Sequence, residues 1–118
     1  LHQNFFETFA DYFISPKILN NVFTNFLAYP IILKEKIKFK RKEFQIFLEK
    51  NMIQTRPIFS GNILRHPAFK ILQSNINKPN SFKNSDYIMK NGLLIGCHQG
   101  LKKKQIEYIH SCIKNFLK

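Results

Sequence analysis

Two of the three arginines in this chain, Arg56 and Arg65, fall within ten residues of each other, although lysine supplies almost all of the other positive charge. A guanidinium group is a planar fork of donors whose geometry matches the oxygens of a phosphate or a carboxylate. The segment from residue 56 to 70 is thus the one place where residue types suggest recognition of an anionic ligand. Its pattern predicts a strand end, a turn, a polar and basic cluster, and a helix start bounded by Pro67.

Three residues of this segment fit more than one interpretation. His66 is either a capping or packing residue before Pro67 or a group that titrates at a site, because its ordinary pKa lies near 6.5. Asn62 follows Gly61 and suits a left-handed turn position. Arg56 precedes a proline, so its backbone is extended and its side chain projects from a strand end. The alternative for Arg56 is a surface ion pair, which would add little stability.

Familiar catalytic patterns are missing from the sequence. It contains no glycine-rich phosphate loop, no Gly-x-Ser-x-Gly elbow and no paired carboxylates, so neither a serine hydrolase nor acid–base catalysis by two carboxylates is indicated. Cys97, His98, His110 and Cys112 are potential zinc ligands, but their spacing matches no usual zinc pattern. Adjacent residues on a strand also point to opposite faces. We therefore expect no metal site, a small buried cysteine at Cys112 and ordinary histidines.

The formal net charge of +12 raises the question of nucleic-acid binding. Lysines are spread along the whole chain, which indicates a compositional bias as much as a binding face, so we do not expect nucleic acid as a partner. The lysine-rich segment 34–42 nevertheless leaves open a small basic module that binds nucleic acid or an acidic partner. Salt-sensitive binding to nucleic acid would favour that alternative.

Other features concern compartment and completeness. Two cysteines are too few for a disulfide framework and favour a reducing, cytoplasmic setting. No apolar run reaches the roughly 18 residues of a membrane span, and Glu7 and Asp11 interrupt the first apolar stretch, so we expect neither a membrane segment nor a leader peptide. Because the chain opens with Leu1, we expect it to be processed, truncated or part of a longer protein.

Hydrophobic periodicity predicts the first half of the fold. Phe5, Phe9, Tyr12 and Phe13 share one face of a helix that ends at Pro16. Residues 17–25 form a loop. The apolar run 26–33 predicts a strand buried on both faces, with Pro30 at a bulge or edge position. After the solvated segment 34–42, a helix runs over 41–51, with an apolar stripe of Phe44, Phe47 and Leu48 and with Asn51 as its C-terminal cap.

The second half begins with a strand over 53–59 and a turn at 61–62. Residues 74–84 form the most loop-like segment. Asn84 or Ser85 caps a short helix that reaches Lys90 and is closed by Gly92. A strand over 93–97 and a helix over 102–117 complete the chain. The prediction is one domain, residues 1–118, of α/β class: a small three-stranded sheet with helices covering one face.

Several blocks of sequence resemble a known family. The string Thr55-Arg56, Phe59 and Gly61-Asn62, followed by Arg65 and Pro67, is the most specific of them. In order and spacing the blocks resemble the C-terminal small domain of the DegT/DnrJ/StrS sugar aminotransferase family. Within it they are most similar to the RfbH-type branch of nucleotide-diphospho-4-keto-6-deoxyhexose 3-dehydrases. The resemblance covers the chain from about residue 29 onward, and more loosely from residue 5.

The resemblance implies the small domain of a fold-type I pyridoxal-phosphate enzyme, a homodimer with its active site at the subunit interface. In such enzymes pyridoxamine phosphate forms an imine with a 4-keto sugar, a histidine acts as the base, and the 3-hydroxyl leaves. The residues that hold the cofactor and the catalytic histidine or lysine belong to a large domain absent from this chain. We therefore expect the chain alone to bind no cofactor and to be inactive. By motif match, Arg56, Phe59, Asn62, Arg65 and His66 would contact the nucleotide-diphospho-sugar substrate.

The function expected from the resemblance is that of the C-terminal part of a 3-dehydrase similar to CDP-4-keto-6-deoxyglucose 3-dehydrase, in lipopolysaccharide O-antigen deoxysugar synthesis. A sugar aminotransferase of the same family is the first alternative. His98-Gln99 stands where the branch usually has Tyr-Pro, which leaves the identity of the sugar open. A non-functional remnant that folds poorly without its packing partner is a further alternative.

Overall fold

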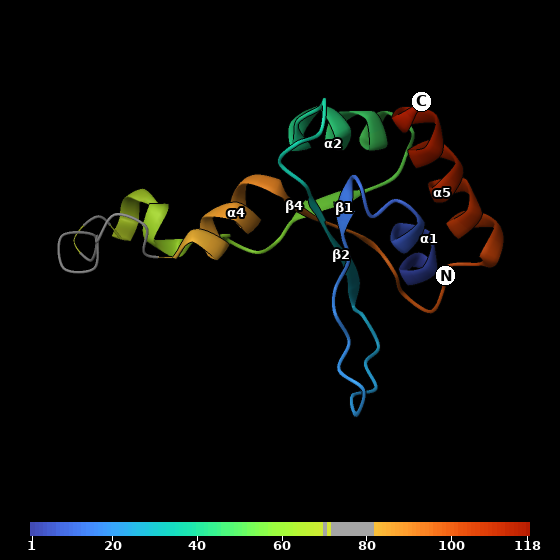
Figure 1. The fold of residues 1–118 in the computed structure, drawn as a ribbon, viewed down its shortest axis with the longest axis horizontal. Helices are drawn as coiled ribbons and strands as arrows, with labels where there is room; N and C mark the ends of the chain where they lie inside the picture. The colour runs from blue at the N-terminus through green and yellow to red at the C-terminus, as the bar shows by residue number, and fades with distance from the viewer. Residues whose placement is uncertain (70, 72–81) are drawn as a thin grey trace.

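The computed structural model describes residues 1–69, 71 and 82–118. Within this part, four strands form one antiparallel sheet in the order β1-β2-β4-β3 (Figure 1). The strands are β1 (Phe13–Ile14), β2 (Ala28–Leu33), β3 (Thr55–Pro57) and β4 (Gly92–Gly96). The helices are α1 (His2–Thr8), α2 (Arg41–Lys50), α4 (Lys83–Asn91) and α5 (Lys103–Leu117), with short 3₁₀ turns η1 (Ile63–Arg65) and η2 (Pro67–Phe69).

The prediction of three strands was wrong, because the first apolar segment is only partly helical. The first helix ends at Thr8, and the chain turns through hydrogen bonds from the amides of Tyr12 and Phe13 to the carbonyl of Phe9. Phe13 then pairs with Leu33 as the start of a short strand. Phe13 does enter the core, but it does so from the sheet rather than from a helix face.

The strand β2 alternates between the two faces of the sheet, so the prediction of burial on both faces was also wrong. Tyr29, Ile31 and Leu33 are buried, whereas Ala28, Pro30 and Ile32 are only partly covered. Side chains two apart on a strand share a face, so helices cover one face only. Pro30 lies beyond the end of β1, where β2 has a neighbour on one side alone, as the edge prediction required.

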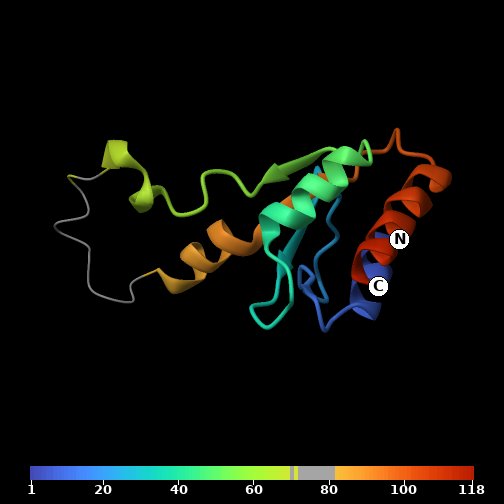
Figure 2. The same ribbon diagram turned by 90° about the horizontal axis from the view of Figure 1, so that it is seen from above.

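The core lies between this face of the sheet and three helices. The buried apolar residues are Phe5 and Phe6 of α1, Phe44 and Leu48 of α2, and Ile109, Cys112 and Ile113 of α5, packed on β2, β4 and Ile53. Helices α1 and α5 lie side by side at one end of the molecule (Figure 2). The α/β layer with helices on one face is therefore confirmed, as is the buried position of Cys112.

The remaining boundaries follow the predicted pattern with small shifts. Helix α2 has Asn51 as its C-cap, as predicted. The predicted strand 53–59 is confined to β3, because Met52 adopts a positive φ of 59° before it and pairing ends at Pro57. The cap of α4 is Phe82, not Asn84 or Ser85. Of the predicted loop 74–84, residues 74–81 lie outside the described residues.

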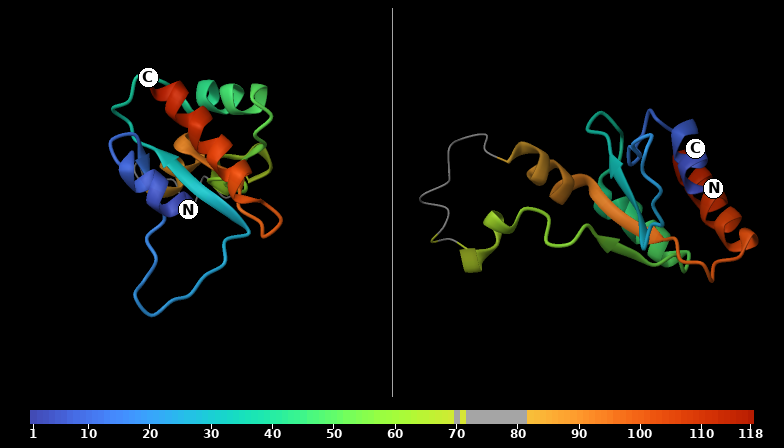
Figure 3. Two further views of the ribbon diagram at one scale, coloured as in Figure 1. Left: turned by 90° about the vertical axis from the view of Figure 1, so that its right-hand side faces the viewer. Right: turned by 90° about the horizontal axis from the view of Figure 1, so that it is seen from below.

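Two parts of the chain project from this core. Residues 15–27, which join β1 to β2, extend away from the sheet, and η1, η2 and α4 form an arm on another side (Figures 1 and 3). Two hydrogen bonds between described residues help to attach the arm to the core. The Tyr87 hydroxyl donates to the Leu33 carbonyl at 2.9 Å, and Arg41 Nε donates to the Lys90 carbonyl at 3.1 Å.

Candidate functional site

An ion pair joins the two sides of the arm. Arg65 Nε donates to Asp86 Oδ1 at 2.9 Å and Arg65 Nη2 donates to Asp86 Oδ2 at 2.5 Å, a two-pronged contact between η1 and α4. Asn62 adds a third bond, from its Nδ2 to Asp86 Oδ1 at 2.7 Å. The Nε and Nη2 donors of Arg65 are thus both used within the chain.

The charge on Asp86 is strongly favoured by these contacts. Hydrogen bonds from Arg65 and Asn62 lower the pKa of Asp86 from its ordinary value to about 2, and the positive charge of Arg65 acts in the same direction. The same carboxylate raises the pKa of Arg65. Both groups therefore stay charged over the whole physiological range.

Asn62 organises the turn that carries this cluster. Its side chain is 4% exposed, and its Oδ1 accepts a hydrogen bond from the Leu64 amide at 3.1 Å, which caps η1. The left-handed turn conformation expected at Asn62 belongs instead to Gly61, at φ +63°. Glycine is required there, because an added Cβ would lie 2.5 Å from the Cβ of Met89.

His66 and Phe59 flank the turn. His66 Nε2 lies 2.7 Å from the Ser60 carbonyl, and since a carbonyl only accepts, that nitrogen carries the hydrogen. This contact closes the turn and agrees with the capping interpretation of His66. Phe59 has φ +45° and is 88% exposed, an unusual state for an aromatic side chain.

Arg56 lies apart from this cluster, on β3. Its partner in the sheet is Leu94, on the face that the helices leave uncovered. Arg56 also lines an open groove of about 650 Å³, which is formed by residues of the sheet and of the first turns of α5. Arg65 lines a different hollow of about 540 Å³, together with Asp86 and Tyr87. The structure thus gathers Asn62, Arg65 and His66 around one turn and places Arg56 in another groove.

The groove beside Arg56 contains polar residues that sequence reasoning did not select. They are Gln54, His98, Lys104, Gln105 and Tyr108. Lys104 and Tyr108 lie one turn apart on α5, so their spacing could have indicated a shared helix face. His98 was considered as a metal ligand and as a departure from the family's usual Tyr-Pro, but not as part of a groove. Among the described residues no group of three or more histidine, cysteine or acidic side chains could hold a metal ion.

A family model connects this chain to known proteins. The model described as the DegT/DnrJ/EryC1/StrS aminotransferase family matches residues 4–114. The chain belongs to this family. The match covers almost the whole chain, so the resemblance carried by the Thr55-to-Pro67 string is confirmed.

The relatives that match at the level of sequence include nucleotide-sugar 3-dehydratases. The chain is 32% identical over 92 residues to the lipopolysaccharide biosynthesis protein RfbH of Salmonella typhimurium. It is 30% identical over 93 residues to the dTDP-4-dehydro-2,6-dideoxy-D-glucose 3-dehydratase of Saccharopolyspora spinosa. These matches span 78% and 79% of this chain, but only 21% and 20% of the two relatives. The chain thus spans about a fifth of the length of these two relatives.

Solved structures agree with this assignment. An Escherichia coli GDP-4-keto-6-deoxy-D-mannose 3-dehydratase with bound hydrated PLP matches 99% of this chain and 29% of its own, with a TM-score of 0.74 and 25% identity. A sugar aminotransferase from Micromonospora echinospora matches 97% of this chain and 29% of its own, with a TM-score of 0.70 and 14% identity. The second match shows the fold alone.

The two hollows differ in the acidic side chains that they could offer to a pyridoxal cofactor. A carboxylate usually holds the protonated ring nitrogen of that cofactor. Among the described residues that line the groove beside Arg56 there is no aspartate or glutamate. In the second hollow, the carboxylate of Asp86 is already bound by Arg65 and Asn62, whereas Glu35 is a second acidic side chain in the lining. No helix in the described part of the chain is long and apolar enough to cross a bilayer.

Proposed function

We propose that this chain is the small-domain part of a pyridoxal-phosphate-dependent nucleotide-sugar 3-dehydratase. One observation carries the proposal: the chain is 25–32% identical to 3-dehydratases of this family and to RfbH, but only 14–15% identical to two aminotransferases of the same fold. The contrast favours the 3-dehydratases over the alternative of a sugar aminotransferase. The name of the Salmonella relative supports a place in lipopolysaccharide synthesis, which we propose occurs in the cytoplasm.

The cofactor and the catalytic base belong, in this proposal, to a larger part of the protein. The groove beside Arg56 supports this division, because no aspartate or glutamate is among the described residues that line it. When bound in that larger part, the cofactor supplies the electron sink for loss of the 3-hydroxyl. The chain alone then has no dehydratase activity, and the complete enzyme is a homodimer that acts on a nucleotide-diphospho-4-keto sugar.

The residues of this chain act on the substrate side. Arg56 provides charge and paired donors for the diphosphate. Phe59 and His66 contact the substrate from the turn. Asn62 and Arg65 contribute by holding that turn, since their donors are bound to Asp86. We propose no catalytic residue in the chain.

Two chimeric enzymes test the proposal. In one, the chain replaces the matching segment of the E. coli GDP-4-keto-6-deoxy-D-mannose 3-dehydratase; in the other, that of the M. echinospora sugar aminotransferase. Each purified chimera is given pyridoxal phosphate and the substrate of its parent. We expect turnover by the dehydratase chimera alone, lowered by Arg56→Gln and unchanged by Lys103→Gln, a surface control.

The other outcomes are also decisive. Turnover by the aminotransferase chimera alone would replace the proposal with the aminotransferase alternative. Two folded, cofactor-loaded chimeras without activity would contradict it.

A further inference from the structure

The segment 34–42, which leads from β2 into α2, concentrates positive charge more than any other part of the chain. It holds six of the 19 basic residues and a single acidic residue, Glu35. The basic residues are Lys34, Lys36, Lys38, Lys40, Arg41 and Lys42. Lysines spread evenly along the sequence would not place about a third of the basic residues in so short a segment. The cluster therefore exceeds the general bias toward lysine.

Exposure alternates along this segment. Phe39 is partly buried, and the centroid of its ring lies 5.8 Å from that of Phe44 and 4.8 Å from that of Phe116. Ile37 is also partly buried and packs against the core. The exposed residues of the alternation are Lys36, Lys38 and Lys40. The two apolar side chains thus fix the segment against the core, while the ammonium groups gather on its outer side.

The positive surface continues onto α4. Arg41 Nε donates to the Lys90 carbonyl at 3.1 Å, which brings the end of α4 beside the start of α2. Residues of both helices line a hollow of about 470 Å³, and its cationic lining residues are Lys34, Lys38, Lys40, Arg41, Lys42 and Lys90. We call the six basic residues of segment 34–42, together with Lys90, the cationic patch.

Two carboxylates lie close to the cationic patch. Glu35 lines the same hollow. Glu43 Oε2 accepts a hydrogen bond from the Lys40 amide at 3.2 Å, as part of the capping box of α2. Asp86, further along α4, is paired with Arg65 instead. Seven positive charges against two negative ones leave an excess of five, so the local field stays strongly positive.

The residue types favour an anionic lipid surface over nucleic acid. Six of the seven cations are lysines, compact point charges that suit lipid headgroups. The guanidinium of Arg41 is engaged with the Lys90 carbonyl. Phe39, the one aromatic residue of the segment, is packed against other rings, so it is a poor platform for base stacking.

An exposed apolar side chain beside the patch also fits a bilayer. Ile46 is 45% exposed and lies one turn after Lys42 on α2. Both residues line an open hollow with Glu49, whose Oε1 accepts two hydrogen bonds of 2.7 Å from Thr55. An aliphatic side chain next to lysines can enter the headgroup region of a bilayer. It gains nothing from a phosphate backbone, which attracts proteins through charge.

We propose that the cationic patch is a peripheral binding site for an anionic phospholipid surface, with Ile46 entering that surface at the edge of the patch. Each lysine or arginine near such a surface strengthens binding about fivefold, and clusters of about four to eight are typical of such sites. The attachment is reversible and electrostatic, so it needs no helix that crosses the bilayer. This inference goes beyond the proposed function and does not depend on it.

Sedimentation of the 118-residue chain with vesicles tests this site. Vesicles of equal parts phosphatidylglycerol and phosphatidylcholine are compared with vesicles of phosphatidylcholine alone. We expect binding to the anionic vesicles only, and weaker binding as salt rises. The double variant Lys36→Gln/Lys38→Gln should weaken it about 25-fold, at about fivefold per lysine.

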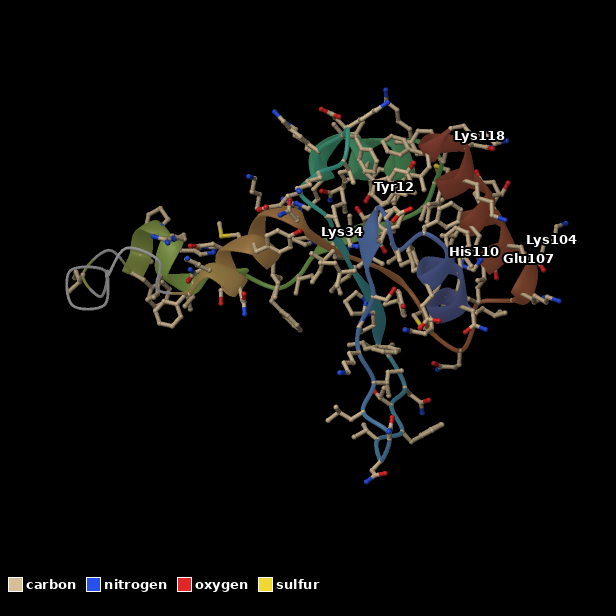
Figure 4. All side chains as sticks on the ribbon, in the orientation of Figure 1. Tyr12, Lys34, Lys104, Glu107, His110 and Lys118 are labelled. Carbon is tan, nitrogen blue, oxygen red and sulfur yellow. The ribbon has the colours of Figure 1, made fainter. Side chains whose placement is uncertain are left out.

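The matched control is the double variant Lys103→Gln/Lys104→Gln. It removes the same charge from exposed positions in the first turn of α5. Figure 4 shows Lys104 well away from Lys34, at the far end of the molecule from the patch. Its vesicle binding should match that of the wild type. Equal losses from the two double variants would show only diffuse attraction by the net charge and would overturn the site.

Ile46→Gln separates a lipid surface from nucleic acid. It should weaken vesicle binding severalfold and leave the binding of a single-stranded RNA oligonucleotide as it was. Vesicle binding that does not respond to Ile46→Gln would overturn the entry of this side chain. Binding of the oligonucleotide in preference to anionic vesicles, lost in Lys36→Gln/Lys38→Gln, would replace the proposal with the nucleic-acid alternative. The amide NMR spectrum of each variant confirms that it is folded.

The two proposals fail in distinguishable ways. An active dehydratase chimera, combined with no binding of the chain to anionic vesicles, would reject the lipid site and keep the function. Patch-dependent vesicle binding, combined with inactive but folded chimeras, would reject the function while the lipid site remains.

Discussion

Arg65 and Asp86 are 21 residues apart in the chain and form a two-pronged ion pair that ties the turn at η1 to helix α4. The arm that carries the family motif is thus closed by its own side chains, and Asn62 joins the same carboxylate from its buried position. Arg65, whose residue type suggested a ligand contact, therefore uses two of its donors to stabilise the fold. This relationship leads to the first prediction.

Substitution of Arg65 by Gln should destabilise the chain at neutral pH and should remove one component of its acid sensitivity. The pKa of Asp86 is lower in the folded chain, at about 2, than its ordinary value of 3.8. The pair therefore stabilises fully above about pH 4 and loses this contribution as the pH falls toward 2. Urea unfolding at pH 7, 4 and 2.5 should show the difference between wild type and variant shrinking at the lowest pH. A difference that stays constant would contradict the assignment.

Gly61→Ala should destabilise the chain by more than about 1 kcal/mol, because a β-carbon is disfavoured at positive φ and would also press on Met89. Gly96→Ala is the matched control. Its added carbon would meet only Leu101, at 3.6 Å, an ordinary contact. Thermal unfolding of both variants should give a lowered midpoint for the first alone. Equal midpoints would show that the turn adapts.

Phe59 combines backbone strain with near-complete exposure. Phe59→Gly should leave stability unchanged or raise it by up to about 1 kcal/mol, since glycine accepts the left-handed conformation but loses more entropy on folding. The dehydratase chimera carrying this change should lose turnover, and Phe59→Tyr, which keeps the ring, should restore it. Full turnover in the glycine variant would remove Phe59 from the substrate-side residues.

Two histidines join α1 to α5: buried His2 and the partly buried His110, which Figure 4 labels on α5. His2 Nδ1 lies 2.9 Å from His110 Nε2, and His2 Nε2 lies 3.1 Å from the Gly96 carbonyl. The carbonyl requires a hydrogen on His2 Nε2, so His2 Nδ1 accepts from His110. The His110 ring also stacks on Phe5. This arrangement requires the His2 ring to be neutral, because its Nδ1 must accept.

These histidines should make stability fall in mild acid. Burial lowers the pKa of both, that of His110 to about 4, and for His110 the nearby His2, N-terminal amine and Lys114 add to the effect. Below pH 6.5 the unfolded chain binds more protons, so stability should fall between about pH 6.5 and 4. Denaturant unfolding of His110→Gln should show a flatter pH profile there. His98→Gln, outside the core, should keep the wild-type slope.

Sequence patterns predicted the parts of the fold that local periodicity controls. Helices α2 and α5 were found because Phe44 and Leu48, and Ile109 and Ile113, recur at helical spacing and point to the core. The apolar run before Phe13 gave the same signal, yet Phe13 pairs with Leu33 across the sheet. Local periodicity cannot predict a strand pairing between residues that are so far apart in the sequence.

The candidate site was predicted by motif rather than by geometry. The motif found Arg56 and Arg65 but could not show that they face different hollows, because that depends on Asp86 arriving from α4. His98, Lys104 and Tyr108 were missed as a group, since only the folded chain brings them to the groove that Arg56 also lines. Taken singly, their residue types do not indicate a binding site; only their shared position in the groove does.

The outer strands of the sheet also limit how copies of this chain can associate. At one edge β1 has only two residues in the described structure, and at the other β3 ends in Pro57, which has no amide hydrogen to donate. A short or proline-bearing margin is a poor template for another strand. Continuous sheet extension of the amyloid kind is thereby discouraged at these two strands.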